Sequence, residues 1–157
     1  MEASIAQMHQ GLAAFRATGA ETIRPYFLAL LAETSAKAGQ HGAGLTLLAE
    51  ALAVINDTGE RRWEAELYRL KGAVLLALSA GHDAEAETCF RQALDIARRQ
   101  QAKSWELRAA MSLARLWQRQ GKRDAARQLL AETYGWFTEG FDTADLQEAK
   151  ALLDELA

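Results

Sequence analysis

The 157-residue sequence contains one proline, one cysteine and no long uninterrupted run of apolar residues. With a single proline and abundant alanine, leucine, glutamate, glutamine and arginine, the composition predicts an all-α chain. The single cysteine, Cys89, excludes an internal disulfide framework and is typical of a reducing compartment. No stretch approaches the ~18 apolar residues of a membrane span, and residues 1–7 lack the features of a secretion signal. These absences predict a cytoplasmic protein that does not enter a membrane.

Glycine recurs near every twentieth residue, between stretches of helical apolar periodicity. The glycines are Gly19, Gly39, Gly59, Gly81, Gly121 and Gly140, and Gln101 fills the one slot where glycine is missing. Glycine readily adopts the left-handed backbone that ends a helix, so this spacing predicts regular helix ends. Two helices, A and B, then make one repeat of 40–42 residues. Stacked antiparallel pairs of this kind predict an α-solenoid of about eight helices.

Each helix B carries a large apolar residue between two small ones. The three sets are Gly44, Leu48 and Ala51; Ala86, Phe90 and Ala93; and Ala126, Leu130 and Thr133. Helix A has its own small residue, which is Ala32, Gly72 or Ala114. Small residues let two helices approach closely while the large residue fills the groove between them. The pattern therefore predicts close packing within each pair.

This pattern resembles the tetratricopeptide repeat, and Glu85–Leu94 is the segment that matches it best. The usual repeat has about 34 residues, so the chain is similar to the long-repeat variety. Residues 100–143 look like the C-terminal repeats of bacterial multidomain regulators, in which a cyclase or DNA-binding domain precedes a signalling ATPase. The resemblance implies a right-handed solenoid that acts as a protein–protein interaction scaffold within a larger signalling protein.

Residues 1–157 are expected to form one domain of this kind. It divides into a trailing helix (1–20), three repeats (21–59, 60–101 and 102–141) and a capping helix (142–157). Residues 1–20 are spaced like a helix B without its helix A, so the chain is expected to be a piece of a larger protein. The apolar face of this helix is then predicted to self-associate, forming a homodimer. Its members are Ile5, Met8, Leu12 and Phe15.

The sequence contains no constellation of residues for chemistry. His9, His41 and His82 stand alone, without cysteine or carboxylate neighbours at metal-ligand spacing. Cys89 lies beside Phe90 in the helix B signature, which favours a buried structural thiol over a nucleophile. We therefore expect no enzyme activity, no metal and no cofactor.

The resemblance places the binding residues on the concave face formed by the A helices. Carried onto this chain they are Tyr26, Glu33, Lys37, Glu66, Arg69, Arg108, Met111, Arg115, Gln118 and Arg119. The spacing of Arg108, Arg115 and Arg119 puts these three side chains on one stripe of a helix. Guanidinium groups pair bidentately with carboxylates, so the predicted ligand is an acidic peptide or a neighbouring domain of the same chain.

Three other interpretations of the charges stay open. Residues 98–127 carry nine basic and two acidic side chains, whereas residues 128–157 carry seven acidic ones and Lys150. This basic belt could bind nucleic acid, the arginines could be a solvated face or pair with the acidic C-terminal region, or the chain could be a spacer without a ligand. A net charge of −3 and the lack of a recognition motif argue against nucleic acid.

Overall fold

The computed structural model describes residues 2–157, and within this range it contains eight α-helices, one short 3₁₀-helix and no strand. The prediction of an all-α chain of about eight helices is therefore confirmed. The helices are α1 (Glu2–Ala17), α2 (Arg24–Lys37), α3 (His41–Thr58), α4 (Glu64–Leu78), α5 (Asp83–Arg99), α6 (Lys103–Arg119), α7 (Arg123–Tyr134) and α8 (Ala144–Glu155), with the 3₁₀-helix η1 at Ala80–His82. In this same range, no helix is both long and apolar enough to cross a membrane.

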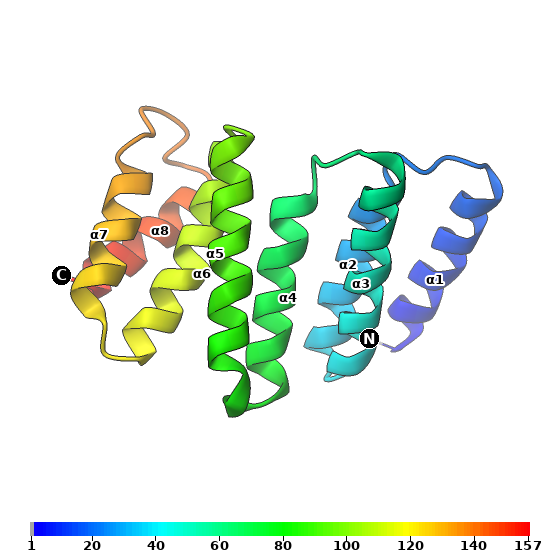
Figure 1. The fold of residues 1–157 in the computed structure, drawn as a ribbon, viewed down its shortest axis with the longest axis horizontal. Coiled ribbons are helices and arrows are strands. Elements are labelled where there is room, and N and C mark those ends of the chain that lie inside the picture. The colour runs from blue at the N-terminus through cyan, green and yellow to red at the C-terminus, as the bar shows by residue number, and fades with distance from the viewer. Residues whose placement is uncertain (1) are drawn as a thin grey trace.

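The helices follow one another along the long axis of the molecule, from α1 at one end to α7 and α8 at the other (Figure 1). Extensive contacts join α2 to α3, α4 to α5 and α6 to α7, and α5 packs on α6 as extensively as α6 packs on α7. The even-numbered helices also touch in a row, α2 with α4, α4 with α6 and α6 with α8, whereas α3, α5 and α7 do not contact one another. Residues of α2, α4 and α6 can therefore contribute to a common surface.

Each helix pair is held by the small and large residues that the sequence pattern pairs. A Cβ atom added to Gly72 of α4 would lie 2.6 Å from Cε1 of Phe90 in α5. A Cβ atom added to Gly44 of α3 would lie 3.1 Å from the carbonyl oxygen of Ala32 in α2. Leu48, Phe90 and Leu130 are all completely buried or nearly so. The predicted close packing is confirmed, and it leaves no room for larger residues at these crossings.

All six glycines lie between α-helices, as predicted, and five of them take the left-handed conformation. Gly19, Gly39, Gly59, Gly121 and Gly140 have φ between 73° and 81°, and Gln101 takes the same left-handed region with φ 53°. Gly81 does not, because Ser79, which follows the last residue of α4, is extended and the chain continues through η1. The turn after α4 therefore needs no left-handed residue.

We predict that Gln101→Gly stabilises the protein by about 0.5–1 kcal/mol. The left-handed conformation costs a non-glycine residue roughly 1–2 kcal/mol, and the greater freedom of glycine in the unfolded chain offsets only part of that. Urea unfolding measures the change. Gly121→Ala is the matched control at the next corner, where φ is 77°, and should destabilise by about 1 kcal/mol. A Gln101→Gly variant that is less stable than wild type would contradict the conclusion that Gln101 is strained in a left-handed conformation.

Candidate functional site

Three adjoining hollows run along α2, α4 and α6, with volumes of about 260, 270 and 330 Å³. The first and second share Glu33 and Leu70, and the second and third share Arg69 and Ala73. Because each hollow shares walls with the next, they form one continuous depression, here called the trough. It is lined almost entirely by the helices that correspond to helix A of each repeat.

Most of the residues predicted for the binding face lie in this trough. They are Tyr26, Glu33, Lys37, Glu66, Arg69, Arg108, Arg115 and Arg119. The placement of Met111 is corrected: it is only 3% exposed and belongs to the hydrophobic core, because α6 is covered by α4 and α5 on one side and by α7 and α8 on another. Gln118 is half-buried and lies outside the lining.

The aromatic end of the trough combines Tyr26, which was predicted for the binding face, with Trp63 and Trp105, which were not. Ring centroids of Tyr26 and Trp63 are 4.7 Å apart, and those of Trp63 and Trp105 are 6.0 Å apart. The row continues away from the trough through Phe27 and Phe15. The recurrence of tryptophan at 63 and 105 was the available signal, although the same recurrence is expected of residues that only pack. The three half-buried rings give this end an apolar wall.

Glu66 lies in the first hollow of the trough, at its aromatic end, and joins α4 to α6. Its side chain is 9% exposed and accepts hydrogen bonds from Arg69 Nε and Nη2 at 2.8 and 2.7 Å. Arg108 Nη1 lies 2.8 Å from Glu66 Oε1, and the Arg108 guanidinium also sits 5.5 Å from the ring centroid of Trp105. Burial acts to lower the pKa of Arg69, but the hydrogen bonds and charge of Glu66 outweigh it and raise that pKa. This buried carboxylate therefore holds two of the predicted arginines in place.

The arginines at the other end of the trough pair with carboxylates of neighbouring helices. Arg115 forms an ion pair with Glu148 of α8, and Arg119 Nη2 lies 3.8 Å from Asp83 of α5. Arg108 Nε is also 3.9 Å from Asp145 of α8. The interpretation in which these arginines pair with the acidic C-terminal region is thus confirmed for Arg108 and Arg115. Since the Arg115 and Arg119 pairs are exposed, each contributes little to stability and can exchange.

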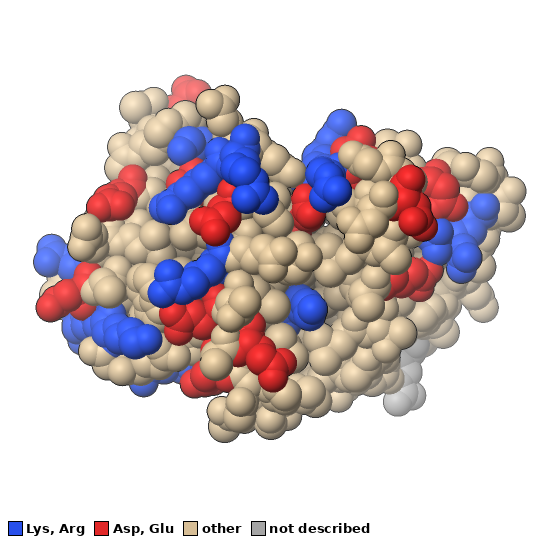
Figure 2. All heavy atoms as spheres, in the orientation of Figure 1, with Lys and Arg blue, Asp and Glu red and all other residues tan. Residues whose placement is uncertain are grey.

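The remainder of the basic belt is also largely neutralised. Arg98 and Lys103 hold Glu106 at 3.1 and 2.7 Å, and Lys122 lies 3.8 Å from Glu87. Arg123 donates hydrogen bonds to the last main-chain carbonyls, those of residues 155–157. Basic and acidic side chains intermingle over the face that Figure 2 shows. The belt is therefore not a uniform positive patch of the kind that binds a phosphate backbone.

The pKa values of the buried Glu106 and the half-buried Glu87 are lowered by hydrogen bonds from their neighbours. Burial acts to raise the pKa of Glu106, but hydrogen bonds from Lys103 and Arg98 outweigh it and the pKa lies below its ordinary value. Burial also acts to raise the pKa of Glu87. Hydrogen bonds from Trp117 and Arg91 outweigh it, so the pKa of Glu87 lies below its ordinary value. Both carboxyl groups therefore favour the charged form more strongly in the folded protein than in the unfolded chain.

The apolar face of α1 is only partly open. Ile5 is 7% exposed and packs in the core with residues of α2 and α3. The prediction that it belongs to an open face for self-association is therefore wrong. Met8, Leu12 and Phe15 are half-buried and border a hollow between α1 and α2. Any partner that binds here must therefore contact residues of both α1 and α2, which line the hollow, rather than α1 alone.

Cysteine and histidine do not form a second site. Cys89 is buried, as predicted, and burial raises the pKa of its thiol, which disfavours the nucleophilic thiolate. His82 Nδ1 lies 3.5 Å from Glu85, and His41 stands apart from it at the start of α3. Across residues 2–157, no group of three or more histidine, cysteine, aspartate or glutamate side chains is placed to hold a metal ion.

The chain matches no protein-family model and no curated protein at a significant level of similarity. Its function is therefore inferred from the geometry and chemistry of the trough.

We predict that Glu66→Ala destabilises the fold by about 3 kcal/mol, because it leaves Arg69 and Arg108 without their shared counter-charge in a buried place. Glu33→Ala is the matched control in the same trough. Its ion pair with Lys37 spans one exposed helical turn, so the loss should be about 0.5 kcal/mol or less. Denaturant unfolding of both variants measures the difference. Equal losses would contradict the bridging role of Glu66.

The lowered pKa of Glu106 makes stability depend on acid pH. Its stabilising contribution is fully present above the ordinary value of 4.5 and is lost as the pH falls through the lower folded-state pKa. Glu106→Gln should therefore cost about 2 kcal/mol at neutral pH. That difference from wild type should shrink as the pH drops below 4.5. Urea unfolding across the acid range measures it, with the exposed Glu139→Gln as a control. A difference that stays constant with pH would count against charge as its source.

Proposed function

We propose that the chain is a non-catalytic protein-interaction module, a right-handed α-solenoid of tetratricopeptide-like repeats that binds a peptide segment in its trough. The observation that carries this proposal is the continuity of the trough along α2, α4 and α6. Support comes from the regular stacking, in which each helix packs on the next one in the chain and each even-numbered helix also contacts the next even-numbered one. An extended depression on such a stack suits a linear segment better than a small molecule.

The lining of the trough favours an acidic ligand. It carries the five basic side chains of Lys37, Arg69, Arg108, Arg115 and Arg119, against the carboxylates of Glu33 and Glu66. The exposed partners of Arg115 and Arg119 lie outside the lining, on α8 and α5. A ligand carboxylate can replace them at small cost, because exposed ion pairs are weak. We therefore expect acidic residues of the ligand at this basic end.

The opposite end of the trough favours an apolar or aromatic side chain. Tyr26, Trp63 and Trp105 are half-buried there and leave a hollow of about 260 Å³. Aromatic rings at offset or edge contacts bind a further ring or an aliphatic chain well. The expected ligand thus combines an apolar anchor with an acidic stretch.

In the setting that the repeat resemblance implies, the module belongs to a cytoplasmic bacterial signalling protein. Its ligand is then a segment of a partner protein or of a neighbouring domain in the same full-length chain. Binding to nucleic acid is less favoured, since most cations of the belt already face carboxylates or main-chain carbonyls.

Peptide selection tests this proposal. Random peptides displayed on phage and selected on the wild-type protein should be enriched in aspartate and glutamate together with an aromatic or aliphatic residue. A selected peptide should bind Ala73→Trp at least about tenfold more weakly, because Ala73 lies at the join of two hollows and a bulky ring there blocks the trough. Ala49→Trp, on the exposed side of α3, is the matched control and should bind normally.

Arg119→Glu probes the basic end without filling the trough, because the Arg119 side chain is 59% exposed. It should weaken the same peptide severalfold and reduce the salt dependence of binding. Calorimetric titration measures both effects, and thermal unfolding verifies that the variants are folded. Selected peptides that bind Ala73→Trp and Arg119→Glu as tightly as wild type would place the binding site elsewhere.

A further inference from the structure

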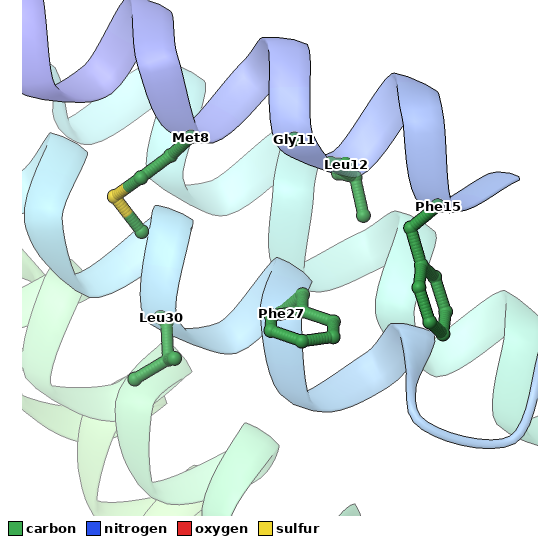
Figure 3. Close-up of a pocket in the computed structure, with 6 residues that line it drawn as sticks. All are labelled: Met8, Gly11, Leu12, Phe15, Phe27 and Leu30. Atoms are coloured by element: carbon green, nitrogen blue, oxygen red, sulfur yellow. The ribbon is translucent and has the colours of Figure 1, made fainter.

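An apolar groove of about 380 Å³ lies open between α1 and α2. Its walls are Met8, Gly11, Leu12 and Phe15 from α1 and Phe27 and Leu30 from α2. Figure 3 shows Leu12 and Phe15 directed from α1 toward Phe27, with Met8 extending from the same helix toward α2. Phe27 is 37% exposed, which is unusual for a phenylalanine in a packed helix. This groove adjoins the first hollow of the trough at Leu30, and all its other walls differ from those of the trough.

The same six positions recur 40 residues later, and there they are covered. They are Leu48, Ala51, Leu52, Ile55, Leu67 and Leu70. Leu48, Ala51, Ile55 and Leu67 are completely buried and Leu70 is 5% exposed. All six pack in one cluster with Leu28, Leu31 and Ala32 of α2. The helix that closes this second groove is therefore α2.

Two further copies of the groove are closed in the same way. In the next repeat the six positions are Phe90, Ala93, Leu94, Ala97, Ala109 and Ser112, and Gly72 of α4 packs directly on Phe90. In the last repeat they are Leu130, Thr133, Tyr134, Phe137, Ala149 and Leu152. Residues of this set pack in one cluster with Leu113 and Ala114 of α6. In all three copies the groove is therefore filled by a helix, which is α2, α4 or α6.

The covering helices share a specific chemistry. Each carries a small, buried residue at the equivalent position, Ala32, Gly72 or Ala114, and Gly72 packs directly on Phe90, the large residue of the helix beneath. At Gly72 the fit is so close that a Cβ atom would collide with the Phe90 ring. The equivalent large residue in the open groove is Met8, which is only half-buried. A helix that fills this groove therefore needs alanine or glycine at the crossing and aliphatic residues on the same face.

We propose that the groove between α1 and α2 binds an amphipathic helix of another polypeptide, one that carries the pattern shared by α2, α4 and α6 and lies antiparallel to α1. A second copy of this chain is a poorer occupant. Its own α2, α4 and α6 are already engaged inside its fold, and its equivalent surface is another concave groove, so the two would not fill each other. The interface would extend the row of contacts that already links the even-numbered helices.

A synthetic peptide with the sequence of residues 21–38, which contains α2, is the probe. Labelled peptide is titrated into the full chain, and binding is followed by fluorescence anisotropy and by amide chemical shifts. We expect saturable binding, with shift changes concentrated in α1 and α2. Phe27→Glu and Leu12→Glu should each weaken binding at least about tenfold, because a charge would be buried against the peptide. A peptide carrying Ala32→Trp should bind as weakly, because the ring would meet Met8.

Ala13→Glu, at an exposed position of α1 outside the groove, is the matched protein control and should bind as wild type does. Ala73→Trp should also bind this peptide normally, which separates this groove from the trough. Absence of saturable binding, or binding that Phe27→Glu leaves unchanged, would overturn the proposal. So would light scattering that shows a wild-type dimer, converted to monomer by Phe27→Glu, because a second copy would then occupy the groove.

Discussion

The architecture depends on the close approach of the two helices in each pair. A helix can come near its partner only where one of them carries a small residue and the other fills the space with a large apolar side chain. Gly72 and Phe90 show this most directly, since even one added carbon would overlap the ring. Because the pairs are tight, the even-numbered helices also reach one another and present a common surface. The trough is a consequence of that packing.

Electrostatics then give the two ends of the trough different characters. In the first hollow, Glu66 is buried between Arg69 and Arg108 and links α4 to α6. Beyond it, the ion pairs of Arg115 and Arg119 are exposed and therefore weak, so these cations stay available to a ligand. The end that holds Glu66 is also walled by the rings of Tyr26, Trp63 and Trp105. A ligand that contacts both ends of the trough must combine apolar and acidic groups.

Some site residues could be predicted from the sequence and others could not, for physical reasons. The spacing of Arg108, Arg115 and Arg119 puts them on one helical stripe, and all three line the trough. Their partners on α5 and α8 could not be identified, because contacts between helices depend on crossing geometry. Met111 was placed on the wrong side, since a repeat position does not reveal that α6 is covered on two sides.

Local signals were enough to specify the helices, most of their ends and the small-to-large pairing within each pair. These features follow from backbone preferences and from the helical period, both of which act over a few residues. Gln101 illustrates this, because its slot in the glycine spacing indicated the left-handed turn that it adopts. The continuity of the trough, its aromatic row and the part that Phe27 and Leu30 of α2 play in the groove beside α1 emerged only from the folded chain. Each joins side chains of different helices, and their distances depend on how successive pairs stack, which no local pattern encodes.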